Sequence, residues 1–452
     1  MFQIRTSTEK ALWVAIAWTA VGGGAYAETL RLSPEKAVEE ALSNSSSLAG
    51  ANASISSSEL ELQSAERGGF PTISAAVSSM YGNGAPYSFF SLNQSIDRGE
   101  AFRVGQKTKG GYASGALTVT VPVFKKGSLF NIDAPAVQQA EAEANKARAD
   151  SLAMSDKVTI EVLQYYLGVL QAEDEVAIHQ QTHDSQSKWL DYVRKRGQEG
   201  LAIKSEELAV ETALATEAAN LNIARRKKDL YMLKLNMAMG NEETRKLELA
   251  KLPDVITDVP PVQELLQRAL NINGTIKSQE AELQLAKAEL EDVKGESLPT
   301  VTFASSAIAA NNIVDNNITS FYSVGLNVAM PIYDFGQKSF KQDAKEAAVI
   351  ENSHKLEAAR EALVHQIHGS YNSLQDAKEQ MEVDKKEIAH AGLVEEESKD
   401  GYEKGFVGLD QVLEDESDTL KAKLKLIEDR YLAWANYYDV IITTGKFVAS
   451  SR

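Results

Sequence analysis

The chain has 452 residues, of which 43% are apolar and 25% are charged, and its net charge is −17. This composition excludes an intrinsically disordered chain. The excess of acidic residues argues against binding to a phosphate backbone, which needs a basic surface, so we expect no nucleic acid among its partners. Only ten prolines occur in the whole sequence, which suits long helices.

The N-terminal segment has the pattern of a secretory signal peptide. Arg5 and Lys10 precede the apolar run ALWVAIAWTAVGGGA, which ends at Ala25-Tyr26-Ala27. A basic start, an apolar centre and an A-x-A end are the three parts of such a peptide. A membrane anchor is the alternative, but the run is short for a bilayer span and three glycines break it. We predict that residues 1–27 are a signal peptide.

The sequence contains no cysteine. An exported protein without disulfides is held together by its own packing or by partner subunits. It also lacks the cysteine that would accept a lipid at a lipoprotein cleavage site. No later stretch reaches 18 apolar residues, so we expect no transmembrane helix. Periplasm, secretion and a β-barrel in an outer membrane remain as possible destinations.

The chain is a tandem duplication of a unit of about 210 residues. The matching segments are FPTIS (70–74) with LPTVT (298–302), LTVTVPVFKKG (117–127) with LNVAMPIYDFG (326–336), and Tyr166 and Gly200 with Tyr371 and Gly405. The offset changes only between these segments, as insertions in loops would produce. We predict a first repeat at 28–240, an inter-repeat link at 241–260 and a second repeat at 261–452.

Each repeat is predicted to begin with a helix that ends at a proline and to continue as two strands. The helices are expected over 35–68 and 262–296, because a helix usually stops at or before the residue that precedes a proline. Alternation of apolar with small or polar residues then indicates strands with two different faces. The predicted strands are 72–82, 117–123, 300–310 and 322–332.

A long helical hairpin completes each repeat. The outgoing helices are predicted at 136–195 and 338–403, and the return helices at 202–239 and 407–444. Gly200 and Gly405 stand at the turns between them. A helix of about 65 residues spans roughly 100 Å, far more than a globular core requires.

Four strands of about ten residues have the length that crosses an outer membrane. Four strands cannot close a barrel, and an open edge cannot face lipid because its backbone groups would be unpaired. Several chains must therefore pool their strands: two chains give eight, and three give twelve with room for a lumen. The hairpins, pooled by the same symmetry, would form a hollow tube coaxial with the barrel. A helical bundle with a small soluble β-domain is the alternative.

This order of elements resembles the TolC-type outer-membrane channel (outer membrane efflux protein) family. The resemblance covers about 30–447 and rests on FPTIS and LPTVT, on the strand ends V-P-V-F and M-P-I-Y, on the turn from Tyr402 to Gly405, and on Gly445. It implies an α+β membrane protein in the outer membrane of a Gram-negative bacterium. A homotrimer would form a twelve-stranded β-barrel, with four strands per chain, continuous with a long periplasmic α-helical barrel.

The same resemblance implies an export duct rather than an enzyme. Such a duct conducts substrate passively from an inner-membrane ABC or proton-driven pump and a periplasmic adaptor to the exterior, and it is gated at the periplasmic helix tips. The absence of a lipid-accepting cysteine and of a long tail after Gly445 slightly favours type I protein secretion over drug efflux. A periplasmic adaptor and a coiled-coil surface protein are alternatives, although neither explains the duplication and the paired strands.

In these channels, carboxylates shortly after the Tyr-x-x-Gly turn narrow a periplasmic aperture. By resemblance those positions are Gln411 and Glu414, with Asp410 and Asp415 beside them, so the first acidic position carries an amide here. A ring of symmetry-related carboxylates would favour cations. The alternative is that Glu414 is a solvated helix carboxylate without a special role.

The family's closed aperture is also braced by an arginine two residues after the turn glycine. That position is Val407 here, its partners in the first repeat match Ser205 and Glu206, and Tyr402 keeps the aromatic residue. The resemblance therefore suggests a brace that rests on hydrogen bonds of Tyr402 rather than on a salt bridge.

The hairpin tips, Gly200-Leu201 and Gly405-Phe406, match the place where the family meets its adaptor. An exposed apolar residue beside a turn glycine suits a docking contact. A plain capped turn is the alternative.

No catalytic, cofactor or metal site is predicted. His179 and His183 are four residues apart on one helix face, but no H-E-x-x-H pattern accompanies them, so we interpret them as a solvated face. The sequence also lacks a P-loop and a G-x-S-x-G elbow.

Overall fold

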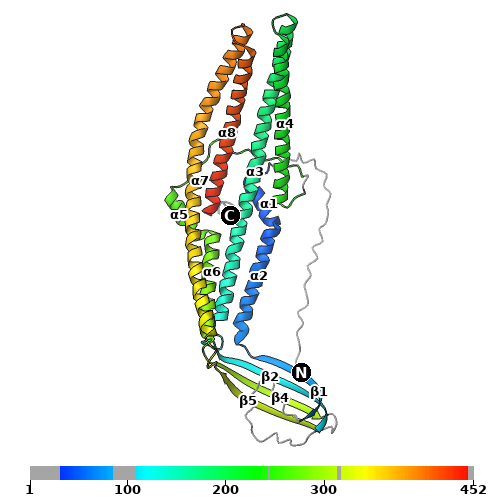
Figure 1. Cartoon of the computed structure of the whole chain (residues 1–452), viewed down its shortest axis with the longest axis vertical. Coiled ribbons are helices and arrows are strands. Elements are labelled where there is room, and N and C mark those ends of the chain that lie inside the picture. The colour runs from blue at the N-terminus through cyan, green and yellow to red at the C-terminus, as the bar shows by residue number, and fades with distance from the viewer. Residues whose placement is uncertain (1–30, 85–107, 243–244, 313–316, 446–452) are drawn as a thin grey trace, which may run out of the picture.

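The computed structural model describes residues 31–84, 108–242, 245–312 and 317–445. Helices form an elongated upper part, and a curved β-sheet lies at its lower end (Figure 1). The predicted signal peptide at 1–27 lies outside the described residues.

Two helices of about 100 Å run the length of the helical part (Figure 1). They are α3 (Pro135–Gln198), with 64 residues, and α7 (Gln337–Glu403), with 67 residues. Shorter helices lie beside them: α2 (Ser46–Glu66) and α6 (Gly274–Gly295) along the lower halves, and α4 (Lys204–Ala238) and α8 (Leu409–Thr443) along the upper halves. The two predicted hairpins, α3–α4 and α7–α8, are confirmed.

The helices predicted over 35–68 and 262–296 are each broken in two, so the prediction of continuous helices was wrong. The first becomes α1 (Pro34–Asn44) and α2, and the second becomes α5 (Val262–Ile272) and α6. At each break a polar side chain caps the next helix: Ser45 Oγ accepts from Leu48 N at 3.3 Å, and Asn273 Oδ1 accepts from Ile276 N at 3.1 Å. Such caps compete with helix continuation.

The sheet is antiparallel in the order β1-β2-β4-β5, with the short β3 paired to the end of β2. The strands are β1 (Thr72–Gly84), β2 (Thr108–Lys125), β3 (Ser128–Leu129), β4 (Thr300–Asn312) and β5 (Asn317–Ala329). The four predicted strands are confirmed, and β2 begins nine residues before its predicted start. The last one ends at Ala329, so Met330 and Ile332 lie beyond it.

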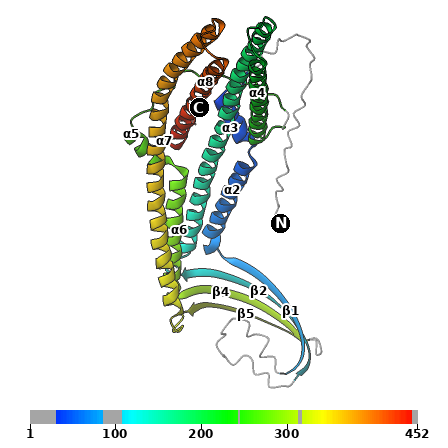
Figure 2. The same cartoon turned by 45° about the horizontal axis from the view of Figure 1, so that its top comes forward.

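The register gives the sheet one apolar face and one polar face. Residues paired across the sheet point to the same side, and one side gathers Ile73, Val77, Leu117, Val119, Val121, Val301, Phe303, Val324, Leu326 and Val328. The other side is rich in hydroxyls, with Ser78 and Ser114 Oγ 2.8 Å apart and Thr118 Oγ1 3.1 Å from Ser306 Oγ. Figure 2 shows that the sheet curves along its strands.

A compact turn after β2 joins the sheet to the helices. Lys126 Nζ lies 2.5 Å from Asp292 Oδ2 on α6, and Asn131 Nδ2 donates to Ala65 O on α2 at 2.7 Å. Gly69 approaches the turn so closely that a Cβ there would lie 2.3 Å from Phe130 O. Both helix-to-strand passages, at Pro71 and Pro299, therefore meet around one turn.

The largest core lies midway along the helices, where residues 245–261 cross them. Leu249, Leu252 and Ile256 from this segment are buried in it. The Tyr166 hydroxyl on α3 lies 2.8 Å from Leu32 O and 2.7 Å from Ala250 O, which ties the start of the first repeat to the inter-repeat segment.

Candidate functional site at the hairpin tips

The two hairpin turns have the same backbone geometry. Gly200 and Gly405 have φ of 76° and 80°, a region that glycine enters without strain. The following residues close the helix ends, with Leu201 N donating to Arg196 O and Phe406 N donating to Gly401 O, both at 2.8 Å. This is a glycine-terminated helix end of the Schellman type.

Both turns present an apolar side chain to solvent. Leu201 is 63% exposed and Phe406 is 84% exposed, and a Cβ added at Gly200 or Gly405 would meet open space. The four residues predicted to dock an adaptor therefore lie on the free ends of the hairpins. Their role in docking stays a prediction.

A cluster of buried side chains joins the two hairpins just below the turns. We call it the tip cluster: Leu190 and Val193 of α3, Val210 of α4, Tyr402 of α7, and Leu409 and Val412 of α8. Because all four helices contribute, the tips of one chain form a single packed unit.

Arg196 of α3 holds Tyr402 of α7 by two contacts. Its Nη1 donates to the Tyr402 carbonyl oxygen at 2.8 Å, and its Cζ lies 4.7 Å from the centre of the Tyr402 ring. The second contact is a cation–π interaction. The sequence had not singled out Arg196; its place in the last turn of a helix, where arginine commonly meets free carbonyls, was the available signal.

The Tyr402 hydroxyl does not take part in that contact. It is buried and faces the Glu206 carboxylate of α4. Burial raises the pKa of the Tyr402 phenol, and the nearby Glu206 carboxylate raises it further. Glu206 Oε2 accepts from Ile203 N at 2.9 Å and so caps its own helix, while Ser205 is exposed.

Val407 stands at the position where the resemblance implied an arginine. A Cβ added at Gly401 would lie only 2.6 Å from Val407 Cγ2, and Val407 borders the tip cluster. Gly401 occupies the same repeat position as Arg196, 205 residues later. The cation that contacts the tip of the second hairpin is therefore supplied by the first.

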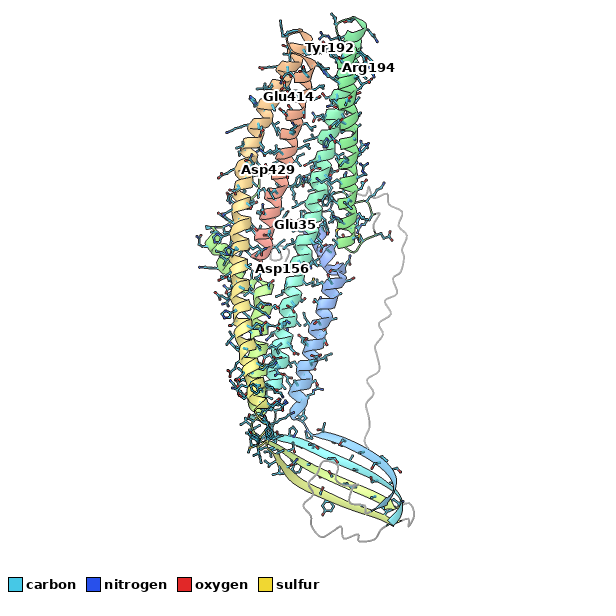
Figure 3. All side chains as sticks on the ribbon, viewed as in Figure 1. Glu35, Asp156, Tyr192, Arg194, Glu414 and Asp429 are labelled. Atoms are coloured by element: carbon cyan, nitrogen blue, oxygen red, sulfur yellow. The ribbon has the colours of Figure 1, made fainter. Side chains whose placement is uncertain are left out.

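The predicted aperture residues begin an exposed stripe on α8. Asp410, Gln411 and Glu414 are exposed in its first two turns, and Glu414 is labelled near the tips in Figure 3. Asp415 is 8% exposed, and its Oδ1 accepts from Gln411 Nε2 at 2.9 Å. Asp415 thus points towards the helices of its own chain, unlike the other three. Their role in an aperture stays a prediction.

A second polar contact that the sequence had not indicated lies one turn deeper. Glu416 of α8 is 5% exposed and accepts from Gln186 Nε2 of α3 at 3.2 Å, with Lys399 Nζ of α7 at 3.7 Å. Burial raises the pKa of Glu416, although Lys399 opposes the shift. Like Arg196, Glu416 links the two hairpins.

The interpretation of His179 as a solvated side chain was wrong. Its side chain is 12% exposed, and its Nδ1 lies 2.7 Å from Glu217 Oε1 on α4.

Within the described ranges, no three His, Cys, Asp or Glu side chains gather as a possible metal-binding group. In the same ranges, no helix has the length and hydropathy that a membrane span requires.

A family model described as outer membrane efflux protein matches residues 37–241 and 265–437. The chain belongs to this family. Family membership agrees with the fold, and the predicted α+β membrane fold and the outer-membrane location are confirmed. One chain alone leaves the barrel open. The family and the fold are those of channels.

Curated relatives and solved structures agree with this assignment. Outer membrane protein TolC of Escherichia coli (strain K12) is 24% identical over 294 residues, and the pyoverdine export outer membrane protein OpmQ of Pseudomonas aeruginosa is 24% identical over 284 residues. These matches cover 62% and 60% of this chain but only 59% of each relative's length.

Two solved outer-membrane proteins share the fold over nearly the whole chain. The CmeC outer membrane channel of Campylobacter jejuni has a TM-score of 0.77 at 16% identity, covering 91% of this chain and 85% of its own. The outer membrane protein VceC of Vibrio cholerae has a TM-score of 0.77 at 16% identity, covering 91% of this chain and 96% of its own.

Proposed function

We propose that three copies of this chain close a twelve-stranded barrel in the outer membrane and continue below it as a helical tube. The observation that carries the proposal is the sheet: its four long strands have one apolar face, and β1 and β5 stand at its two ends. An edge in lipid must find a partner strand. Pairing β5 of one copy with β1 of the next supplies that partner at both edges.

The closed assembly would act as an export duct gated at the hairpin tips. Gln411, Glu414 and Asp410 lie exposed beside the turns, where a threefold axis would bring their copies together. Arg196 and the tip cluster bind the two hairpins of each chain to one another. Opening would then require the second hairpin to separate from the first, which places the gate at a contact within each chain.

An adaptor and an inner-membrane pump would complete the export path. Leu201 and Phe406 are exposed at the free ends of the hairpins, away from the sheet. Apolar side chains beside open turns suit a protein partner more than water. We propose that a periplasmic adaptor covers them and connects the duct to an ABC or proton-driven pump.

As the first candidate for the transported substrate we propose a polypeptide, exported by type I protein secretion. A small molecule is the second candidate, which the likeness to a pyoverdine export protein favours. The two candidates differ in whether the pump that copurifies with the duct handles polypeptides or small molecules.

The test begins with the full chain extracted from outer membranes in detergent. We expect a heat-sensitive trimer that forms pores in a planar bilayer and copurifies with an adaptor and a pump after cross-linking. Leu201→Ser with Phe406→Ser should abolish the cross-link to the adaptor while leaving pore formation intact. A soluble monomer in the periplasm would contradict the whole proposal, and a pore that binds adaptor equally well in the variant would contradict the docking assignment.

A further inference from the structure

Two carboxyl groups, one buried and one half-buried, lie between the two helices of the second hairpin. Asp384 of α7 has no exposed surface, and it is hydrogen-bonded to Asp429 of α8, which Figure 3 labels midway along the hairpin. Each group has a buried Oδ2 atom that no ordinary donor reaches. Two carboxyl groups can hydrogen-bond to each other only when one of them carries a proton.

The surroundings of the pair favour placing that proton on Asp429. Gln380 Nε2 and Lys425 Nζ contact Asp384 Oδ1 at 2.8 and 3.1 Å. Burial alone would raise the pKa of Asp384, but hydrogen bonds from Gln380, Asp429 and Lys425 outweigh it and hold the pKa below its usual value. Burial, and then the hydrogen bond and charge of Asp384, raise the pKa of Asp429 to about 6.

The other charged groups nearby do not neutralise the pair. Lys425 also faces Glu387 of α7, 3.7 Å away, and Glu428 of α8 adds a further negative charge. The charged groups of α3 at this level have partners of their own: Asp174 Oδ2 accepts from the Tyr431 hydroxyl at 2.8 Å, and His179 pairs with Glu217.

The first hairpin has a protonatable pair at the same level. Asp384 follows His179 by 205 residues, the offset that relates Gly200 to Gly405. His179 reaches across to Glu217 of the return helix, as Asp384 reaches across to Asp429. Both outgoing helices thus carry a largely buried titratable side chain at this repeat position.

We propose that Asp384 and Asp429 share one proton across the second hairpin and that losing this proton loosens the packing of α8 on α7. With the proton present, a hydrogen bond joins the helices; without it, two negative charges face each other in a buried place with only Lys425 beside them. A carboxyl whose pKa is raised in the packed state stabilises packing at acid pH, and this contribution is lost as pH rises through about 6. Since α8 also carries Gln411 and Glu414, the effect would reach the aperture if the proposed function holds.

Hydrogen exchange on the full-length channel in detergent tests the packing itself, without relying on conduction. After correction for intrinsic exchange rates, amides of α7 and α8 around the pair should open about tenfold more often at about pH 8 than at about pH 5. Asp429→Asn should remove this pH dependence, because its amide donates to Asp384 at any pH. Glu428→Gln is the matched control: it removes a neighbouring exposed carboxylate, so the transition should remain, with its midpoint at a slightly lower pH.

Lys425→Gln keeps the proposal testable if Asp429→Asn does not fold. Without the ammonium group, the pair should hold its proton to a higher pH, so the midpoint of the exchange transition should move upward. A wild-type channel with no transition, an unchanged transition in Asp429→Asn, or an unmoved midpoint in Lys425→Gln would each overturn the proposal. Failure of the proposed duct would appear separately, as absent pores or absent trimers, with the exchange result intact.

Discussion

The two hairpins share a backbone and differ in the chemistry of their tips. Their return helices, α4 and α8, each have 35 residues, and their turns have the same hydrogen bonds around Gly200 and Gly405. Yet in the closer cation–π contact Arg196 of the first hairpin lies over Tyr402 of the second, while in the longer one Lys399 of the second lies over Trp189 of the first. The exposed acidic stripe belongs to the second hairpin alone among the described tips. The two repeats therefore share one backbone geometry, and their different side chains give each tip its own contacts.

The largest effect should come from removing the Tyr402 side chain. Tyr402→Ala deletes a ring that is 4% exposed, and truncating a buried aromatic residue typically costs about 3–5 kcal/mol. We expect a clear rise in single-channel conductance and a lower melting temperature. Tyr402→Phe should have a much smaller effect, because it keeps the ring that contacts Arg196 and removes only the hydroxyl that faces Glu206. If Tyr402→Phe opens the channel as much as Tyr402→Ala, the brace depends on the hydroxyl and its contact with Glu206 rather than on the ring.

Removing the Arg196 side chain should have the next largest effect. Arg196→Ala loses a charged hydrogen bond and a cation–π contact, together about 2–3 kcal/mol, and should raise conductance. Arg194→Ala is a matched control on the same helix, because Arg194 pairs with Glu207 and Glu211 within the first hairpin only (Figure 3). Equal conductance changes in both variants would show that the contact between hairpins has no special weight.

The contact at Glu416 should make the thermal stability of the channel depend on pH. Burial raises the pKa of Glu416, so its contribution to stability is greatest at acid pH and is lost as pH rises through that raised pKa. Glu416→Gln should flatten the corresponding part of the melting temperature plotted against pH. Glu211 occupies the same repeat position in the first hairpin but pairs with Arg194 near the surface. Glu211→Gln is therefore the matched control and should not reproduce the flattening seen with Glu416→Gln.

A smaller change is expected from the exposed stripe. Replacing Gln411 and Glu414 together by Ala should raise conductance and reduce the preference for cations, because it removes three carboxylates and three amides from a threefold constriction. Planar-bilayer recordings of conductance and reversal potential measure both effects. No change in either quantity would remove these two residues from the aperture.

Local signals account for what the sequence predicted well. The prolines at Pro71 and Pro299, the alternation along β5 and the glycines at Gly200 and Gly405 each act within a few residues, so the strands, hairpins and turns followed from them. The Arg196–Tyr402 contact joins residues 206 apart in the chain. It depends on how the packed helices are rotated against each other, which no local pattern encodes.

The breaks at Ser45 and Asn273 show a different failure, because the signal was present but outweighed. Both residues favour helix caps, yet each stands inside a long helical pattern that continues on either side. Their separation of 228 residues equals the offset between FPTIS and LPTVT. Each capping residue alone is a weak signal. Because the two recur at the repeat offset, comparing the repeats would have located both breaks.

The smallest effects should come from these two caps, and they should be unequal. Removing a cap costs about 0.5–2 kcal/mol. Asn273→Ala should lie at the upper end, because Ile276 is 1% exposed and Gly274 packs against α3 so tightly that an added Cβ would lie 2.6 Å from Ala153 N. Water therefore cannot replace the lost acceptor. Ser45→Ala should lie at the lower end, because α2 buries no residue completely and its first amides remain near solvent. The melting temperatures of the two variants measure the difference. The controls are Ser45→Asn and Asn273→Ser, each of which keeps a capping side chain. Equal losses of stability in the two alanine variants would mean that solvent reaches both helix starts alike.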